Sequence, residues 1–176
     1  MSKLRRHRVI ESRTVYSGKI VGLEVDRVEI EGREHVREVV RHPGGVVILG
    51  QLPDGRIPFV RQHRYPMDEV LLELPAGKLE PGEPPEVSAA RELEEETGYR
   101  AEDLQLVLRF YSSPGFCDEL LSFFYGQHLV PGQRSPEEDE FLEVVLYSLD
   151  EALQLAQSGQ ILDVKTLTAL YWLKAK

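Results

Sequence analysis

Short apolar stretches rich in β-branched residues fill the first third of the chain, and this pattern is typical of β-strands. Four such stretches stand out: VYSGKIVGLEVDRVEIEG, EHVREVVRH, GGVVILGQL and IPFVRQHRY. The segments EGRE, HPGG and PDGR separate them and carry the glycine and proline of turns. The sequence therefore predicts a run of strands and hairpins up to about residue 65.

The pattern changes after VLLELPAG, where a helix is predicted from about Pro85 to Thr97. Pro84 and Pro85 stand where a helix can begin, and Gly98 stands where one can end. Apolar or small side chains recur inside it at spacings of three, three and four, a stripe that suits docking onto a sheet. The stripe comprises Val87, Ala90, Leu93 and Thr97.

The rest of the chain alternates strands with helices. DLQLVLRFY, LLSFFYGQHLV and FLEVVLYSL read as strands, PGQRSPEEDE as an acidic loop, and DEALQLAQSG and DVKTLTALYWLKA as helices. Strands on a sheet with segregated helices predict an α+β architecture, in which mixed strand pairing remains open.

Carboxylates crowd one face of the predicted helix. Glu92, Glu95 and Glu96 are neighbours at helical spacing, late in the helix where the macrodipole disfavours negative charge. Hard divalent cations take oxygen ligands, so the cluster predicts a Mg²⁺ or Mn²⁺ site. A solvated acidic face is the alternative interpretation.

Composition narrows the classes of protein. The chain has 176 residues and a formal net charge of -9, which argues against nucleic-acid binding. It has no apolar run of membrane-spanning length and no secretory signal pattern, so a cytoplasmic protein without a membrane partner is expected. A single cysteine, Cys117, excludes an internal disulfide.

The segment GKLEPGEPPEVSAARELEEETGY, residues 77–99, resembles the Nudix box. That pattern is a glycine, five residues, a glutamate, seven residues, then R-E-U-x-E-E-x-G-U, where U is bulky and apolar. Eight positions match: Gly77, Glu83, Arg91, Glu92, Leu93, Glu95, Glu96 and Gly98. Only Tyr99 departs, being aromatic where an aliphatic residue is commoner. The resemblance implies a Nudix-type α/β/α sandwich on a mixed β-sheet with N-terminal antiparallel strands, which replaces the looser α+β expectation.

The resemblance also implies roles for the residues of the box. Metal ligands would be Glu92, Glu96, Glu95 and the backbone carbonyl of Ala76, with Mg²⁺ as the cofactor and Mn²⁺ or another divalent cation as a substitute. Glu138 and Glu140 of the acidic loop are the candidate general bases, and Glu95 is the rival. The structural residues of the motif would be Gly77, Glu83, Arg91 and Gly98, and Arg91 is expected to pair with Glu83 or a neighbour.

Flanking segments are similar to those of bacterial ADP-ribose pyrophosphatases. SSPGFCDE at residues 112–119 resembles their S-P-G-F-x-D-E element, and PFVRQHRYP and the N-terminal strands are similar too. The resemblance implies hydrolysis of ADP-ribose to AMP and ribose 5-phosphate. It suggests as substrate-binding residues Ile20, Arg37, Arg61, Arg64, Pro114, Gly115 and Glu119. It also implies a homodimer formed through N-terminal strands 1–42, followed by a hydrolase domain over 43–176.

Three alternatives stay open from the sequence. In the first, the substrate is another nucleotide sugar such as GDP-mannose. In the second, the chain is a non-catalytic module that senses ADP-ribose, and in the third it is an RNA 5′-end pyrophosphohydrolase. The intact glutamates argue against the sensor, and the net charge and SSPGFCDE argue against the RNA enzyme.

Overall fold

The computed structural model describes residues 6–136 and 141–176 and divides into two compact units. The first unit combines the chain up to Pro43 with Tyr111–Leu120, and the second contains Gly44–Phe110 and Leu121–Lys176. The predicted domain division, 1–42 and 43–176, remains a prediction about independent domains. No helix within the described residues is long and apolar enough to cross a membrane.

The first unit is built on an antiparallel sheet of three consecutive strands. They are β1 (Arg8–Ser17), β2 (Gly22–Ile30) and β3 (Arg33–Arg41), in the order β1-β2-β3. Glu31 and Gly32 both have positive φ, as the tight two-residue turn between β2 and β3 requires. The first strand begins at Arg8, seven residues before the predicted stretch, because backbone pairing with β2 extends through charged residues that carry no apolar signal.

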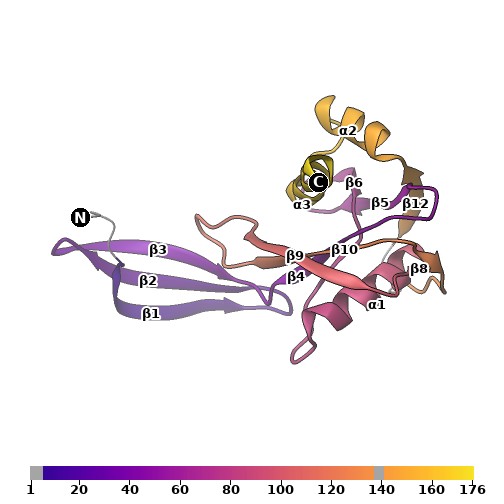
Figure 1. Cartoon of the computed structure of the whole chain (residues 1–176). Helices are drawn as coiled ribbons and strands as arrows, with labels where there is room; N and C mark the ends of the chain where they lie inside the picture. The colour runs from indigo at the N-terminus through magenta and orange to yellow at the C-terminus, as the bar shows by residue number, and fades with distance from the viewer. Residues whose placement is uncertain (1–5, 137–140) are drawn as a thin grey trace. The chain divides into compact units, whose positions relative to one another are not determined.

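The second unit is centred on a mixed four-stranded sheet in the order β7-β4-β10-β9 (Figure 1). Its strands are β7 (Ala76–Lys78), β4 (Gly45–Gly50), β10 (Leu120–Gly126) and β9 (Leu104–Tyr111). β4 runs parallel to β10 and antiparallel to β7. β7 leads into the long helix, so this edge of the sheet positions the residues of the motif.

Two smaller sheets complete the strands of this unit. One is antiparallel, in the order β12-β5-β6, and the other pairs β11 with β8. These strands are β12 (Leu142–Tyr147), β5 (Ile57–Arg64), β6 (Glu69–Glu73), β11 (Val130–Pro131) and β8 (Tyr99–Arg100).

Three helices cover the four-stranded sheet on opposite faces: α1 (Pro85–Thr97), α2 (Leu149–Gln157) and α3 (Val164–Ala175). Successive side chains of a strand point to opposite faces. Val46 and Ile48 of β4 accordingly pack in a cluster with α1, whereas Val47 and Leu49 pack in a cluster with α2 and α3. Figure 1 shows α1 on one side of β4 and α3 on the other. The predicted α/β/α sandwich on a mixed sheet is confirmed.

Helix α1 has the predicted bounds, but only Leu93 and Thr97 of the predicted stripe are buried. Val87 is 51% exposed and Ala90 is also exposed. The buried residues are Ser88, Ala89, Glu92, Leu93, Glu96 and Thr97. The prediction assumed that only apolar positions face the sheet. The helix instead turns two carboxylates inward, together with small residues that leave them room.

Candidate active site

The loop between β7 and α1 brings a glycine directly against a carboxylate of the helix. A Cβ atom placed on Gly77 would lie 2.0 Å from Cδ and 2.1 Å from Oε1 of Glu92. Any side chain at this position would therefore displace the Glu92 carboxylate. The glycine that begins the motif is required by this close approach, because its φ is not in the left-handed region.

The second buried carboxylate, Glu96, lies against the same strand. The backbone N–H of Ala76 donates a hydrogen bond to Glu96 Oε2 at 3.2 Å. Glu92 is 9% exposed and Glu96 is 2% exposed, four residues apart on one face of α1. Burying ionised carboxylates costs several kcal/mol each unless charges or hydrogen bonds compensate them. The chain thus holds two carboxylates beside the Ala76–Gly77 backbone at a considerable energetic cost.

The guanidinium of Arg91 contacts three carboxylates. Its Nε and Nη2 donate to the two oxygens of Glu83, each at 3.1 Å, and its Nη1 lies 2.9 Å from both Glu92 Oε1 and Glu95 Oε2. Nη2 also contacts Ser88 Oγ at 3.4 Å. The hydrogen bonds to Glu83, then the charge of Glu92 and the hydrogen bond to Glu95, raise the pKa of Arg91, so it is always a cation. The expected contact with Glu83 ties the loop before α1 to the helix.

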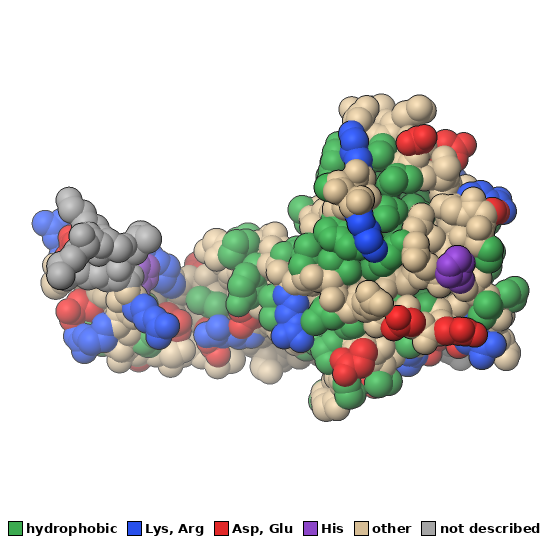
Figure 2. Space-filling view, in the orientation of Figure 1, with side chains coloured by type: hydrophobic (Ala, Val, Ile, Leu, Met, Phe, Trp, Pro, Cys, Tyr) green, Lys and Arg blue, Asp and Glu red, His purple; other side chains and the backbone are tan. Residues whose placement is uncertain are grey.

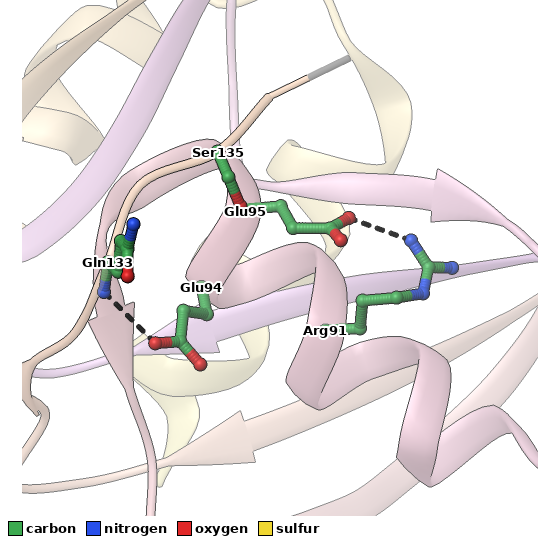
Figure 3. Close-up of a pocket in the computed structure, with 5 residues that line it drawn as sticks. All are labelled: Arg91, Glu94, Glu95, Gln133 and Ser135. Carbon is green, nitrogen blue, oxygen red and sulfur yellow. Dashed lines mark hydrogen bonds and ion pairs between the residues drawn. The ribbon is translucent and has the colours of Figure 1, made fainter.

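A small open pocket lies along the solvent side of α1. It has a volume of about 330 Å³ and is lined by Arg91, Glu94, Glu95, Gln133 and Ser135. Figure 3 shows the Glu95 carboxylate directed at Arg91 and the Glu94 carboxylate directed at the backbone nitrogen of Gln133. Glu94 therefore has a different neighbour from the other acids of α1.

The donor chemistry of this cluster fits a hard divalent cation. Carboxylates and a backbone carbonyl are the ligands that Mg²⁺ and Mn²⁺ prefer. Across residues 6–136 and 141–176, no three acidic, histidine or cysteine side chains already converge as a metal-binding group. The reason is visible in the contacts: Arg91 draws Glu92 and Glu95 to itself, while Glu96 faces the Ala76 amide. Glu83, Glu92 and Glu95 contact Arg91, and the charge of Arg64 also acts on Glu96, yet negative charge still exceeds positive charge on this face, and a cation would relieve the excess.

A second buried ion cluster lies at the end of β6, immediately before the loop. Glu73 is 1% exposed and accepts two hydrogen bonds from Arg64, from Nε and Nη2, each at 2.7 Å. Lys165 of α3 also contacts Glu73 and pairs with Asp163 at 2.9 Å. Burial disfavours the ionised form of Glu73, but the Arg64 hydrogen bonds and the Lys165 charge outweigh it and lower its pKa.

The sequence analysis missed Glu73, Lys165 and Thr166. Thr166 Oγ1 accepts a hydrogen bond from the backbone N–H of Leu74 at 2.8 Å, so α3 holds the strand that leads to the motif. A single charged residue inside the apolar run VLLELP was the available signal. A buried acid in such a run requires cationic partners.

Of the three arginines predicted to bind substrate, the two in the second unit have different surroundings. Arg64 is engaged by Glu73, whereas Arg61 makes an exposed ion pair with Glu143 at 3.1 Å. Arg61 and Glu143 are both at least half exposed, so this pair can exchange partners at little cost.

The other predicted substrate-binding residues belong to the first unit. Ile20 is 51% exposed, and Arg37 Nη1 donates to the Val36 carbonyl at 2.9 Å. Pro114 and Gly115 are exposed in a turn, as their residue types suggested. Glu119 Oε1 lies 3.5 Å from His42 Nδ1. Glu138 and Glu140, the candidate bases, lie outside the described residues.

Comparison with known proteins gives a family and several relatives. A model of the NUDIX domain matches residues 41–168. The chain is 42% identical to the ADP-ribose pyrophosphatase of Bacillus subtilis (strain 168), covering 99% of this chain and 96% of that protein. It is 41% identical, with the same coverage, to the methanol dehydrogenase activator of Bacillus methanolicus.

A solved structure, described as the crystal structure of ADP compounds hydrolase, matches the fold. The TM-score is 0.86 at 23% sequence identity, and the alignment covers 99% of this chain and 98% of the other. At that identity the likeness concerns the fold.

Proposed function

The chain belongs to the NUDIX family, and from that premise we propose that it hydrolyses the pyrophosphate bond of ADP-ribose with Mg²⁺, giving AMP and ribose 5-phosphate. The observation that carries the proposal is the pair of buried carboxylates, Glu92 and Glu96, held on one face of α1 beside the Ala76–Gly77 backbone. The relative named ADP-ribose pyrophosphatase, aligned over almost the whole chain, supports the choice of substrate.

The chemistry requires negative phosphate oxygens to be neutralised while water attacks phosphorus. Mg²⁺ bound by Glu92, Glu96, Glu95 and the Ala76 carbonyl would supply that neutralisation and lower the pKa of water. Gly77 leaves the space in which the Glu92 carboxylate sits. Arg91 holds the loop against the helix through its hydrogen bonds to Glu83.

Proton removal from water requires a carboxylate near the cluster. In our proposal Glu138 or Glu140 is this general base, and Glu95 is the rival because it already lies among the other carboxylates. Single substitutions E138Q, E140Q and E95Q separate the three. The base is the residue whose replacement lowers kcat most and removes the acidic limb of the pH profile.

For substrate recognition, we propose that guanidinium groups bind phosphate or ribose. Arg64 and Arg61 are the candidates of the second unit, since their planar donors match phosphate oxygens. The candidates of the first unit are Ile20, Arg37, Pro114, Gly115 and Glu119. Alanine substitutions at these positions are expected to raise KM for ADP-ribose more than they lower kcat.

The deciding experiment is a substrate panel with purified protein and Mg²⁺, analysed by chromatography of the products. The panel contains ADP-ribose, GDP-mannose, NADH, diadenosine polyphosphates, 8-oxo-dGTP and a 5′-triphosphorylated RNA. AMP and ribose 5-phosphate from ADP-ribose, at the highest kcat/KM of the panel, is the expected result. Preference for GDP-mannose would show that the substrate is another nucleotide sugar. Binding of ADP-ribose without turnover would show that the protein is a sensor.

We also propose that the chain forms a homodimer through the first unit. Its strands β1 and β3 and the connection between β1 and β2 expose large apolar side chains, namely Val9, Val15, Tyr16, Ile20, Val21 and Val36. Figure 2 shows charged side chains of both signs scattered among apolar ones on the visible face of this unit.

Light scattering tests the dimer: twice the 20.1 kDa chain mass is expected, and a monomeric mass at micromolar concentration would refute it. A cytoplasmic location and the lack of a nucleic-acid partner remain predictions.

A further inference from the structure

Residues 130–135, the capping segment, lie along the C-terminal end of α1 and occupy its open carbonyl groups. A helix leaves its last four carbonyls without partners inside the helix. The N–H of Gly98 donates a hydrogen bond to the Glu94 carbonyl at 2.8 Å. The N–H of Ser135 donates a hydrogen bond to the Glu95 carbonyl at 3.0 Å, and Arg134 Nε donates one to the Glu96 carbonyl at 2.9 Å. The capping segment thus holds the backbone of the residues that carry two of the proposed metal ligands.

The rest of the capping segment fits closely against the same turn. The N–H of Gly132 donates to the Gly98 carbonyl at 2.8 Å, and the N–H of Gln133 donates to Glu94 Oε1 at 3.0 Å. A Cβ atom on Gly132 would lie 2.6 Å from Glu94 Oε1, so the backbone approaches as closely as a glycine permits. Figure 3 shows Gln133 and Ser135 beside Glu94 and Glu95.

Arg134 makes a second contact that the other residues of the segment do not. Its Nη2 donates to the carbonyl of Leu142, the first residue of β12. One guanidinium therefore joins the end of α1 to the start of β12. It also brings positive charge to a helix end that has no basic residue in its last turn and carries Glu94, Glu95 and Glu96 there. A cation at this end offsets both the macrodipole and the acids.

We propose that Arg134 is a positioning residue for the reaction. It fixes the last turn of α1, and with it the carboxylates of Glu95 and Glu96, by holding a carbonyl of that turn and a carbonyl of β12 at once. Without it, two carbonyls lose their charged donor and the turn can shift, which changes the spacing of the ligands. The proposal rests on the proposed function for its kinetic consequences but not for its structural ones.

The test compares R134A and R134K with R100A. Arg100 is the matched control, since it lies at the same end of α1, its side chain is more than half exposed, and within the described residues its ion pair is a loose one with Glu94 at 3.7 Å. R134A is expected to lower kcat, and the affinity for Mg²⁺ that supports turnover, by roughly 10- to 100-fold, the usual effect of losing a group that orients metal ligands. KM for ADP-ribose is expected to change by less than about threefold, because no substrate contact is removed.

Two readouts separate positioning from a general loss of stability. Added guanidinium ion at millimolar concentration is expected to restore part of the kcat of R134A, while R100A keeps wild-type kinetics without it. R134K is expected to be intermediate, since an ammonium group can hold one carbonyl but not a planar pair. A wild-type kcat and Mg²⁺ affinity in R134A, even with a lowered melting temperature, would overturn the proposal.

Hydrogen exchange tests the proposal when kinetics cannot be measured. If the wild-type protein does not cleave ADP-ribose, the proposed function fails, but the backbone N–H groups of Gly132 and Ser135 still report on the capping segment. Faster exchange at both in R134A than in R100A supports the proposal, and equal exchange overturns it. If R134A does not fold, R134K gives the same comparison.

Discussion

The two buried ion clusters of the second unit differ in charge balance. At the end of β6, Glu73 and Asp163 face Arg64 and Lys165, two negative against two positive groups. On α1, by contrast, Arg91 is in contact with three carboxylates, and the buried Glu96 adds a fourth to the face. The first cluster balances its own charges, although the charge of Arg64 also acts on Glu96, whereas the second has a surplus of negative charge.

This difference separates a structural cluster from a functional one. A neutral, fully hydrogen-bonded network holds elements together, here β5, β6 and α3. A surplus of buried charge lowers stability, and a chain retains it where a ligand of opposite charge binds. The comparison predicts that a divalent cation stabilises the protein through α1 and that substitutions in the β6 cluster change stability independently of it.

Removing a buried carboxylate of α1 is expected to have the largest effect. E92Q and E96Q should each lower kcat by about 10³-fold, because neutralisation of the phosphates depends on these ligands. Mg²⁺ should raise the melting temperature of the wild type but not of either variant, since only a bound ligand shifts the folding equilibrium. E94Q is the matched control, with the same substitution on the same helix. Wild-type kinetics and a wild-type response to Mg²⁺ in E92Q and E96Q would refute the metal assignment.

Breaking the neutral cluster should cost about 3 kcal/mol of stability, the lower end for a buried ion pair that loses one partner. The change is E73Q, measured by chemical denaturation. E143Q is the control, since it removes the exposed pair with Arg61 and should cost less than about 1 kcal/mol. Similar losses in the two variants would contradict the distinction.

The same variant tests the pH dependence. The folded-state pKa of Glu73 is lowered from its ordinary value of 4.5, so its contribution is fully present above about pH 4.5 and is lost as the pH falls through the folded-state pKa. The wild type should therefore lose stability relative to E73Q as the pH falls through that window. A constant difference between the two would show that Glu73 is not the titrating group.

Substituting the glycine beside Glu92 should reduce activity without removing any charge. In G77A the added Cβ displaces the Glu92 carboxylate, and kcat is expected to fall about 100-fold, as misplacement of a catalytic group by 1 Å does. G22A is the control, because a Cβ there meets its nearest atom at an ordinary 3.6 Å. A fully active G77A would mean that the position of Glu92 does not matter.

The smallest effect is expected where Arg91 holds the loop. E83Q weakens both hydrogen bonds to the guanidinium, and the stability should fall by about 1 kcal/mol, with less than a tenfold loss of kcat. E80Q, an exposed acid of the same loop, should leave both quantities unchanged. An E83Q effect on kcat as large as that of E92Q would place Glu83 among the ligands instead.

The local pattern predicted helix α1 and the identity of its motif correctly. Pro85 at the start and Gly98 at the end bound the helix as expected, with Gly98 in the left-handed conformation at φ 74°. These positions act through local backbone sterics, which a sequence reveals directly. Membership of the NUDIX family, expected from the spacing of the glutamates, is confirmed by the domain match.

The buried face of α1 was predicted only in part, because the helix buries two carboxylates of the candidate site. The first half of the predicted stripe, Val87 and Ala90, is exposed, whereas Leu93 and Thr97 are buried on a face that also contains Glu92 and Glu96. Hydrophobic periodicity assumes that burial follows apolarity, and a site that buries charge breaks this rule.

The sequence by itself indicated the longer strands and the helices in their order, the ends of α1 and the residue types of the motif, because these depend on neighbours along the chain, but it did not indicate strands β6, β7 and β8. Only the tertiary structure decided which acids Arg91 holds, that Gly77 makes room for Glu92, and that Arg134 and Lys165 bring charge from distant segments. These contacts join residues as many as 92 positions apart, so they are set by how the sheet and helices pack and not by any local pattern.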